Sequence, residues 1–75
     1  MEILNLIGDL PIPLPIDSSA IDAAEYTPST EELVVTFTDG SSYSYTVDAA
    51  TVAAFVAASS QGQYFNANIR PLGPS

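Results

Sequence analysis

The chain has 75 residues, so it holds one small domain whose hydrophobic core is thin. It contains no cysteine and no histidine, and its one basic side chain, Arg70, stands against nine carboxylates for a formal net charge of −8. This composition excludes disulfides, thiolate metal sites and imidazole catalysis, and it disfavours binding to nucleic acid or anionic membranes, which depends on Lys and Arg.

The first 17 residues form an apolar, proline-rich segment, called the arm below. Pro11, Pro13 and Pro15 fix φ and remove every second amide donor, so we expect an extended chain and neither a helix nor a central strand. Because Glu2 replaces the basic start of a signal peptide, we expect no export signal and no membrane span, and a cytoplasmic or virion location.

Large aliphatic side chains fill the rest of the arm. Leaving each of them in water costs about 1.5–3 kcal/mol relative to full burial, so we expect these side chains to be buried against a surface. Two surfaces are possible: the domain's own, or a groove on another chain. On the second alternative the partner-binding residues are Ile3, Leu4, Leu6, Ile7, Leu10, Ile12, Leu14 and Ile16.

The middle of the chain predicts antiparallel strands. A weak strand at 20–26 ends at a turn that begins at Thr27 and Pro28, and stronger strands follow at 33–38 and 42–47. Asp39-Gly40 between the last two strands is a hairpin signal.

The length of the hairpin loop decides which side chains share a face. A two-residue loop would point Tyr43 and Tyr45 away from Leu33 and Val35. A three-residue loop with a left-handed Gly40 pairs Val35 with Tyr43 and Leu33 with Tyr45, and burial favours this second register. The apolar face then collects Leu33, Val35, Phe37, Tyr43, Tyr45 and Val47.

A helix is expected from Ala49 to about Ser60, with Asp48 as its N-cap and Gly62 at or just past its C-terminal stop. Its outer face carries alanine and no charge, so it is either a plain surface of high helix propensity or a surface that packs on a partner or on the arm. The core stripe consists of Val52, Phe55, Val56 and Ser59, and Tyr64, Phe65 and Ile69 follow to close the core.

Residues 18–70 resemble the KTSC domain. The motifs that carry the resemblance are Ser18-Ser19-x-Ile21, Tyr26-x-Pro28, Leu33-x-Val35-x-Phe37, Gly40, Tyr43-x-Tyr45 with Val47, and Ala58-x-Ser60-x-Gly62-x-Tyr64-Phe65-Asn66 with Ile69-Arg70. Such domains occur alone in bacterial and phage proteins and at the C-terminal end of some lysyl-tRNA synthetases. The resemblance implies nucleic-acid binding, the activity suggested for the family, but this chain lacks the family's usual basic residues apart from Arg70.

Few residues could carry chemistry. The serines have no activating base, Glu31 and Glu32 point to opposite faces of a strand, and no metal-ligand spacing occurs, so we expect no enzyme, no cofactor and no metal. Tyr43 and Tyr45 either form an aromatic platform for a base or sugar or lie half-buried with their hydroxyls at the rim. Arg70 either binds a carboxylate or phosphate or makes a structural ion pair.

These patterns together predict an α+β fold: a three-stranded antiparallel β-meander with one packed helix and an extended arm. The expected division is an arm at 1–17, a KTSC-like domain at 18–70 and a tail at 71–75. We expect a non-catalytic protein-interaction or assembly module, in the concrete case a capsid or tail accessory protein of a phage virion, whose arm docks on a protein partner or on further copies. The alternatives are a nucleic-acid-binding module that uses Tyr43 and Tyr45, and an acidic inhibitor of a host protein.

Overall fold

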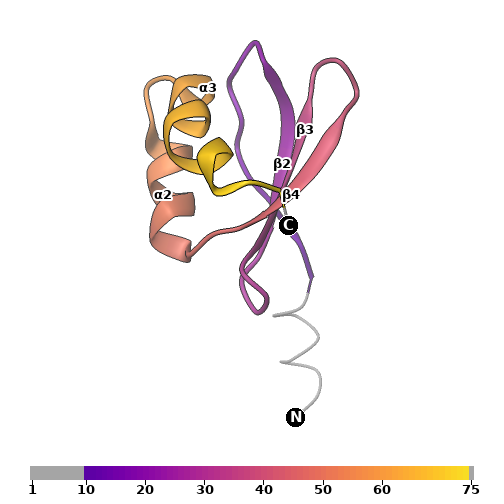
Figure 1. The fold of residues 1–75 in the computed structure, drawn as a ribbon, viewed down its shortest axis with the longest axis vertical. Helices are drawn as coiled ribbons and strands as arrows, with labels where there is room; N and C mark the ends of the chain where they lie inside the picture. The colour runs from indigo at the N-terminus through magenta and orange to yellow at the C-terminus, as the bar shows by residue number, and fades with distance from the viewer. Residues whose placement is uncertain (1–9, 75) are drawn as a thin grey trace.

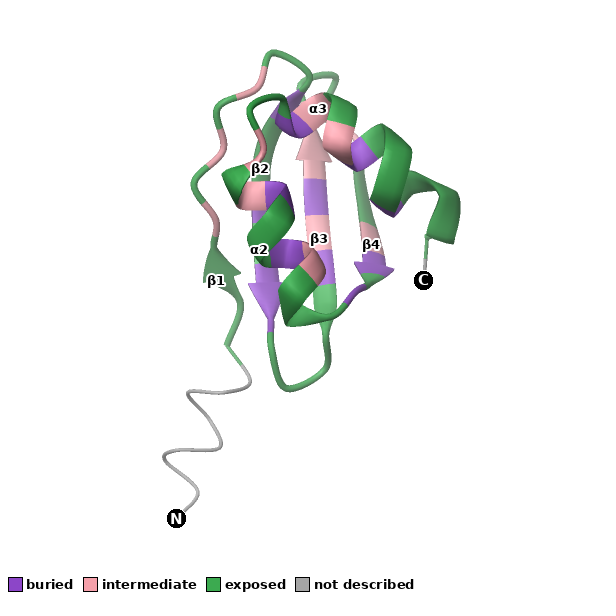
Figure 2. Ribbon diagram, turned by 90° about the vertical axis from the view of Figure 1, so that its left-hand side faces the viewer, coloured by how far each residue is buried: buried purple, intermediate pink, exposed green. Residues whose placement is uncertain are grey.

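A computed structural model describes residues 10–74 as an antiparallel sheet of four strands covered on one face by helices (Figure 1). The strands lie side by side in chain order: β1 (Ile12–Pro13), β2 (Ile21–Thr27), β3 (Glu32–Phe37) and β4 (Ser42–Thr46). The helical layer consists of α2 (Ala49–Ala57), α3 (Gln61–Tyr64), the π-helical turn η1 (Phe65–Ile69) and the 3-10 turn η2 (Arg70–Leu72). Figure 2 shows α2 lying across the sheet, with β1 at one side of the molecule and the C-terminal turns at the other.

The predicted α+β class is confirmed, but the prediction of three strands and one helix is wrong. The arm supplies a fourth strand, because Ile12 and Pro13 pair with Tyr26 and Glu25 of β2. Prolines at alternate positions leave the amides between them free to bond, and the Leu14 amide donates to the Ala24 carbonyl at 2.9 Å. The prolines therefore block a central strand but allow one at the edge of a sheet.

The predicted hairpin register is confirmed. Val35 lies opposite Tyr43 and Leu33 opposite Tyr45. Gly40 closes the loop with a φ of 92°, and its amide donates to the Phe37 carbonyl at 2.9 Å. Only a residue without a Cβ adopts that backbone easily, so the glycine fixes the loop length and with it the face that each side chain occupies.

The predicted N-cap of the first helix is confirmed, whereas its predicted end is wrong. The Asp48 carboxylate accepts from the Thr51 amide at 2.9 Å. The helix ends at Ala57, and Gly62 lies inside α3 instead of stopping α2. Ser60 explains the difference, because its hydroxyl accepts from the Gln63 amide and starts a second helix at the point where the first was expected to continue.

The run from Gln61 onward keeps one face buried over several turns. Gln61, Phe65 and Ile69 follow at intervals of four residues, and all three are buried. A spacing of four residues is longer than one turn of an α-helix, whereas a π-helical turn contains more residues than an α-helical one. The change from α3 to η1 therefore keeps these three side chains on the same side, facing the sheet.

Phe65 occupies the centre of the core. Its ring lies 5.4 Å from that of Phe37 and 5.3 Å from that of Tyr45, both with edge-on geometry. The apolar residues of the core are Ile21, Ala24, Tyr26, Leu33, Val35, Tyr45, Val47, Val52, Phe55, Phe65 and Ile69. The predicted core stripe is confirmed at Val52 and Phe55, while Ser59 lies beyond the end of α2 and is exposed.

Candidate functional site

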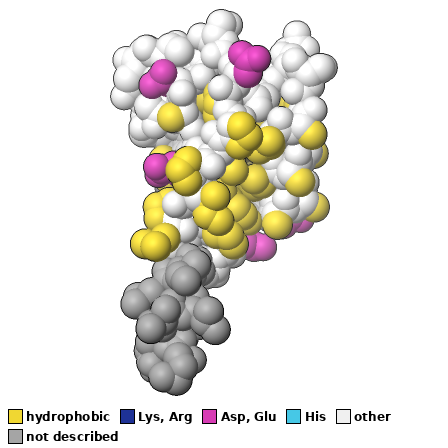
Figure 3. Space-filling model, turned by 180° about the vertical axis from the view of Figure 1, so that it is seen from behind, with side chains coloured by type: hydrophobic (Ala, Val, Ile, Leu, Met, Phe, Trp, Pro, Cys, Tyr) yellow, Lys and Arg dark blue, Asp and Glu magenta, His cyan; other side chains and the backbone are white. Residues whose placement is uncertain are grey.

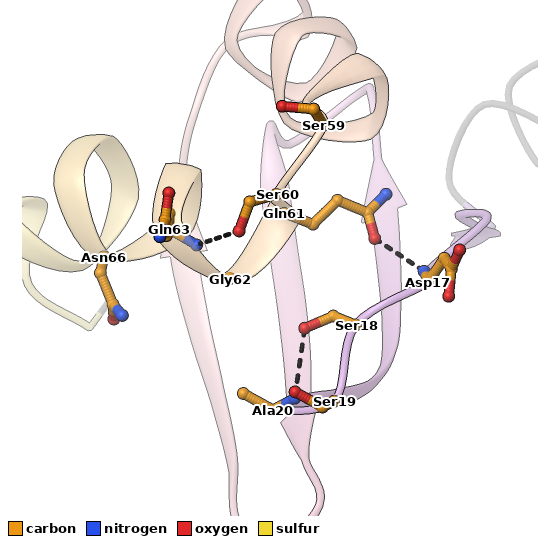
Figure 4. A pocket seen from close by; sticks show the side chains of 10 residues that line it. All are labelled: Asp17, Ser18, Ser19, Ala20, Ser59, Ser60, Gln61, Gly62, Gln63 and Asn66. Atoms are coloured by element: carbon orange, nitrogen blue, oxygen red, sulfur yellow. Dashed lines mark hydrogen bonds between the residues drawn. The ribbon is translucent and has the colours of Figure 1, made fainter.

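Polar residues from the two ends of the domain meet at one hollow of about 350 Å³ (Figure 4). The first group follows the arm and the second spans the start of α3, so segments more than forty positions apart face each other there. The residues that line this polar hollow are Asp17, Ser18, Ser19, Ala20, Ser59, Ser60, Gln61, Gly62, Gln63 and Asn66.

Gln61 connects both sides of the polar hollow to α2. Its side-chain oxygen accepts from the Asp17 amide at 2.7 Å, and its side-chain nitrogen donates to the carbonyls of Pro15 at 3.0 Å and Val56 at 3.2 Å. The residue is only 6% exposed. A buried amide whose donors and acceptor are all used holds its neighbours in one arrangement, so Gln61 fixes the arm against the helical layer.

The serines of the polar hollow are engaged with the backbone. The Ser18 hydroxyl accepts from the amides of Ala20 and Ile21, and the Ser60 hydroxyl caps α3. A Cβ on Gly62 would lie 3.4 Å from the Ser18 hydroxyl oxygen, which measures how closely the two segments approach. These two hydroxyls support turns by accepting from backbone amides.

A second hollow, of about 290 Å³, brings together two of the predicted ligand residues. Tyr43 and Arg70 line it with Phe37 and Asp39. The Arg70 guanidinium donates to the Asn66 side chain at 3.0 Å, so in this structure it bonds an amide oxygen and not a carboxylate. Hydrogen bonds from Ser41 lower the pKa of Asp39, so the hollow carries one fixed negative charge beside its one positive charge.

The two predicted ligand tyrosines differ in how far their side chains are buried. Tyr45 is 3% exposed and packs on Phe65, whereas Tyr43 on the same face is 46% exposed. Tyr43 is therefore not a core residue, although it shares β4 with Tyr45; it lies nearer the hairpin end of the strand. Of the two tyrosines, Tyr43 therefore presents the exposed ring in this structure.

The arm residues fall into three groups. Leu14 and Ile16 pack against the core of their own domain, so the chain itself covers them. Leu10 and Ile12 are 60% and 49% exposed. We call Leu10 and Ile12, with the exposed prolines Pro11 and Pro13, the arm patch. The remaining predicted partner residues, Ile3, Leu4, Leu6 and Ile7, lie outside the described residues.

A third hollow, the arm–helix groove, opens between the arm and the end of α2. Its volume is about 360 Å³. Pro15, Ile16 and Asp17 form one side, Val56, Ala58 and Ser59 form the other, and Gln61 spans both. Figure 3 looks onto the side of the molecule where β1 runs, and hydrophobic side chains gather there while acidic ones lie around them.

Sequence reasoning missed the role of Gln61 and the pairing of β1. A signal for the glutamine exists, since it precedes Phe65 and Ile69 at the same spacing of four and so shares their buried face. The signal for the strand is the alternation of proline with aliphatic residues, which suits an edge position.

Among residues 10–74 no cluster of three or more acidic, cysteine or histidine side chains could hold a metal ion. Within the same residues no helix combines the length and apolar character that crossing a bilayer requires.

The family model described as KTSC domain matches residues 17–72. That range takes in every element from β2 to η2, and both sides of the polar hollow, and it leaves β1 outside. No curated protein matches the sequence.

Proposed function

The chain belongs to the KTSC domain family, and from that premise we propose that it is a non-catalytic module for protein interaction or assembly. The arm patch carries this proposal. Leu10 and Ile12 expose large aliphatic side chains at the free edge of the sheet, next to a face rich in apolar side chains (Figure 3). Covering such half-exposed side chains with a partner is worth about 1 kcal/mol or more each.

The chemistry of the described residues supports a binding role over a catalytic one. The polar hollow uses its serines and Gln61 to hold backbone groups, and in the hollow beside Tyr43 the Asp39 carboxylate accepts hydrogen bonds from the Ser41 amide and hydroxyl. In its specific form the proposal is a capsid or tail accessory protein of a phage virion, because domains of the kind that this chain resembles occur alone in bacterial and phage proteins and the arm patch adds an exposed apolar surface.

An acidic inhibitor of a host protein is the second candidate. All the carboxylates of the described residues are exposed, so the domain presents negative charge outside its apolar faces to a basic partner. Both candidates need a protein partner, but they differ in what holds it: apolar contact with the arm patch in the first, and charge, lost at high salt, in the second.

The test compares the two exposed side chains of the arm patch with one exposed leucine elsewhere. Leu10→Asn with Ile12→Asn removes the arm patch, and Leu72→Asn is the matched control, since Leu72 is 59% exposed on η2, at the other side of the molecule (Figure 2). Co-purification of the tagged full chain from its native cells, with light scattering of the product, gives stoichiometry. We expect the double variant to lose the partner or the oligomer at any salt concentration while Leu72→Asn keeps it.

Two outcomes would contradict the proposal. One is a wild-type chain that stays a single copy and retains no protein in a fixed ratio. The other is a double variant that retains the same complex as the wild type. Circular dichroism of each variant verifies that the fold survives, which we expect because both side chains already face solvent.

A further inference from the structure

The free edge of β1 lacks the donors that a partner strand would need. The amides of the even-numbered residues turn inward, as the bond from Leu14 to Ala24 shows. The outward positions are Pro11, Pro13 and Pro15, and proline has no N–H. A protein that binds at this edge therefore cannot extend the sheet in the usual way and must bind through side-chain contacts.

Hydrogen bonds from one buried side chain tie together the two sides of the arm–helix groove. The Gln61 amide bonds both of its walls, at Asp17 and at Val56, so the groove does not need to form on binding. Ile16, Val56 and Ala58 give it an apolar lining. A rigid groove of about 360 Å³ accommodates one long side chain without the cost of ordering a loop.

The electrostatics of the groove favour a positive charge. The exposed Asp17 carboxylate stands at one side. The C-terminal end of α2 stands at the other, and its last turn contains no basic residue to neutralise the carbonyl end of the helix. The net charge of −8 adds a field of the same sign, which disfavours a second copy of this chain as the occupant.

We propose that the arm–helix groove binds a lysine or arginine side chain of the protein partner. The aliphatic stem packs on Ile16, Val56 and Ala58, and the charged group lies between Asp17 and the end of α2. This inference rests on the proposed function and adds the chemistry of the partner: an apolar surface for the arm patch with a cationic side chain next to it.

The test uses two synthetic amphipathic helical peptides, one of leucine and lysine and one of leucine and glutamine, with titration calorimetry and amide chemical-shift mapping on the full chain. The key variant is Asp17→Asn. The matched control is Asp22→Asn, which removes the same charge from an exposed position on β2. We expect Asp17→Asn to weaken binding of the lysine peptide about three- to fivefold, the size of one exposed charge contact. Binding of the glutamine peptide should stay unchanged.

The shifts caused by the lysine peptide should centre on residues 15–17 and 56–59. Equal weakening by Asp17→Asn and Asp22→Asn, shifts elsewhere, or no binding of the lysine peptide would overturn the inference. Failure of this inference is distinct from failure of the proposed function. A native complex that requires Leu10 and Ile12 but persists in Asp17→Asn would contradict the groove assignment alone. A native complex that persists when Leu10 and Ile12 are replaced would contradict the proposed function.

Discussion

Single polar side chains stabilise this small domain by hydrogen bonds that join distant segments. Gln61 is the clearest case, because one amide joins the arm, α2 and α3 through three hydrogen bonds. Tyr26 is another: its ring belongs to the core while its hydroxyl donates to the Val47 carbonyl at 2.9 Å. Each side chain joins segments that are distant in the sequence, so its loss should affect both local order and global stability.

Replacing Gln61 by methionine tests the fastening of the arm. The substitution keeps the length of the side chain but leaves the Asp17 amide and two carbonyls without their partner, which costs about 1–3 kcal/mol. Chemical denaturation measures the loss, and hydrogen exchange at the Leu14 amide reports release of β1. Gln63→Met is the control at an exposed glutamine and should change stability by less than about 0.5 kcal/mol. Equal effects of the two substitutions would contradict the role of Gln61.

Replacing Tyr26 by phenylalanine tests the buried hydroxyl. Loss of its bond to Val47 should cost about 1–2 kcal/mol, whereas Tyr43→Phe, at an exposed ring, should cost almost nothing.

The same variant removes a pH dependence. Burial, with the charges of Glu31 and Asp48, raises the pKa of Tyr26 above its ordinary 10.0. The folded protein thus holds this proton more tightly than the unfolded chain, and the contribution is full below pH 10.0 and declines as pH rises further. Denaturation at alkaline pH should therefore show a smaller decline in Tyr26→Phe than in the wild type, and parallel declines would contradict this.

At the scale of elements, local sequence signals predicted features that depend on one segment and missed features that depend on two competing or pairing segments. The Asp39-Gly40 turn and the alternation around it predict the hairpin and its register, because loop geometry and burial act on neighbouring residues. The end of α2 depends on a competition between continuing one helix and capping another at Ser60, which propensity alone does not resolve.

The candidate site divides in the same way. Alternation assigns Tyr43 and Tyr45 to one face of the sheet, but it carries no information on where the helical layer stops, and this decides that one ring is buried and the other exposed. The pairing of β1 with β2 likewise depends on which edge is left open after the hairpin forms. The aliphatic arm did predict a need for cover, and Leu14 and Ile16 obtain theirs from their own domain.

The N-cap of α2 gives an element-scale prediction in acid. Hydrogen bonds from Thr51 lower the pKa of Asp48 below its ordinary 3.8, so the folded state favours the ionised form. The stability that this cap contributes is present above pH 3.8 and is lost as pH falls through the lower folded value. Asp48→Ala should lower Tm by several degrees near neutrality and by less below pH 3.8. Asp48→Asn should keep an N-cap in both pH ranges. A constant difference across that range would contradict the assignment.

The prolines of the arm give a second element-scale prediction. Changing Pro11, Pro13 and Pro15 to threonine restores outward amides on β1 and makes its edge a template for another strand. We expect self-association, measured by light scattering across a concentration series, to rise above the wild-type level. Pro74→Thr controls for loss of an exposed proline elsewhere. A triple variant that matches the wild type would show that the prolines do not protect this edge.

The whole molecule has one basic side chain and nine carboxylates, so its overall charge disfavours a polyanion as partner. Arg70 can neutralise at most one phosphate, and counterion release therefore contributes little to affinity for a nucleic acid. The Asp39 charge in the same hollow and the net charge of −8 oppose even that contact. A lone exposed Tyr43 offers stacking for one base, where single-strand binders use several aromatic rings along a basic groove.

We therefore expect no retardation of single-stranded RNA in a gel-shift assay at micromolar protein and low salt, the condition that most favours electrostatic binding. The Tyr43→Ala and Arg70→Gln variants should behave like the wild type, because the repulsion comes from the whole surface. Retardation by the wild type that both variants abolish would contradict this and restore the nucleic-acid alternative, since it would mean that stacking and one guanidinium overcome the field of the entire domain.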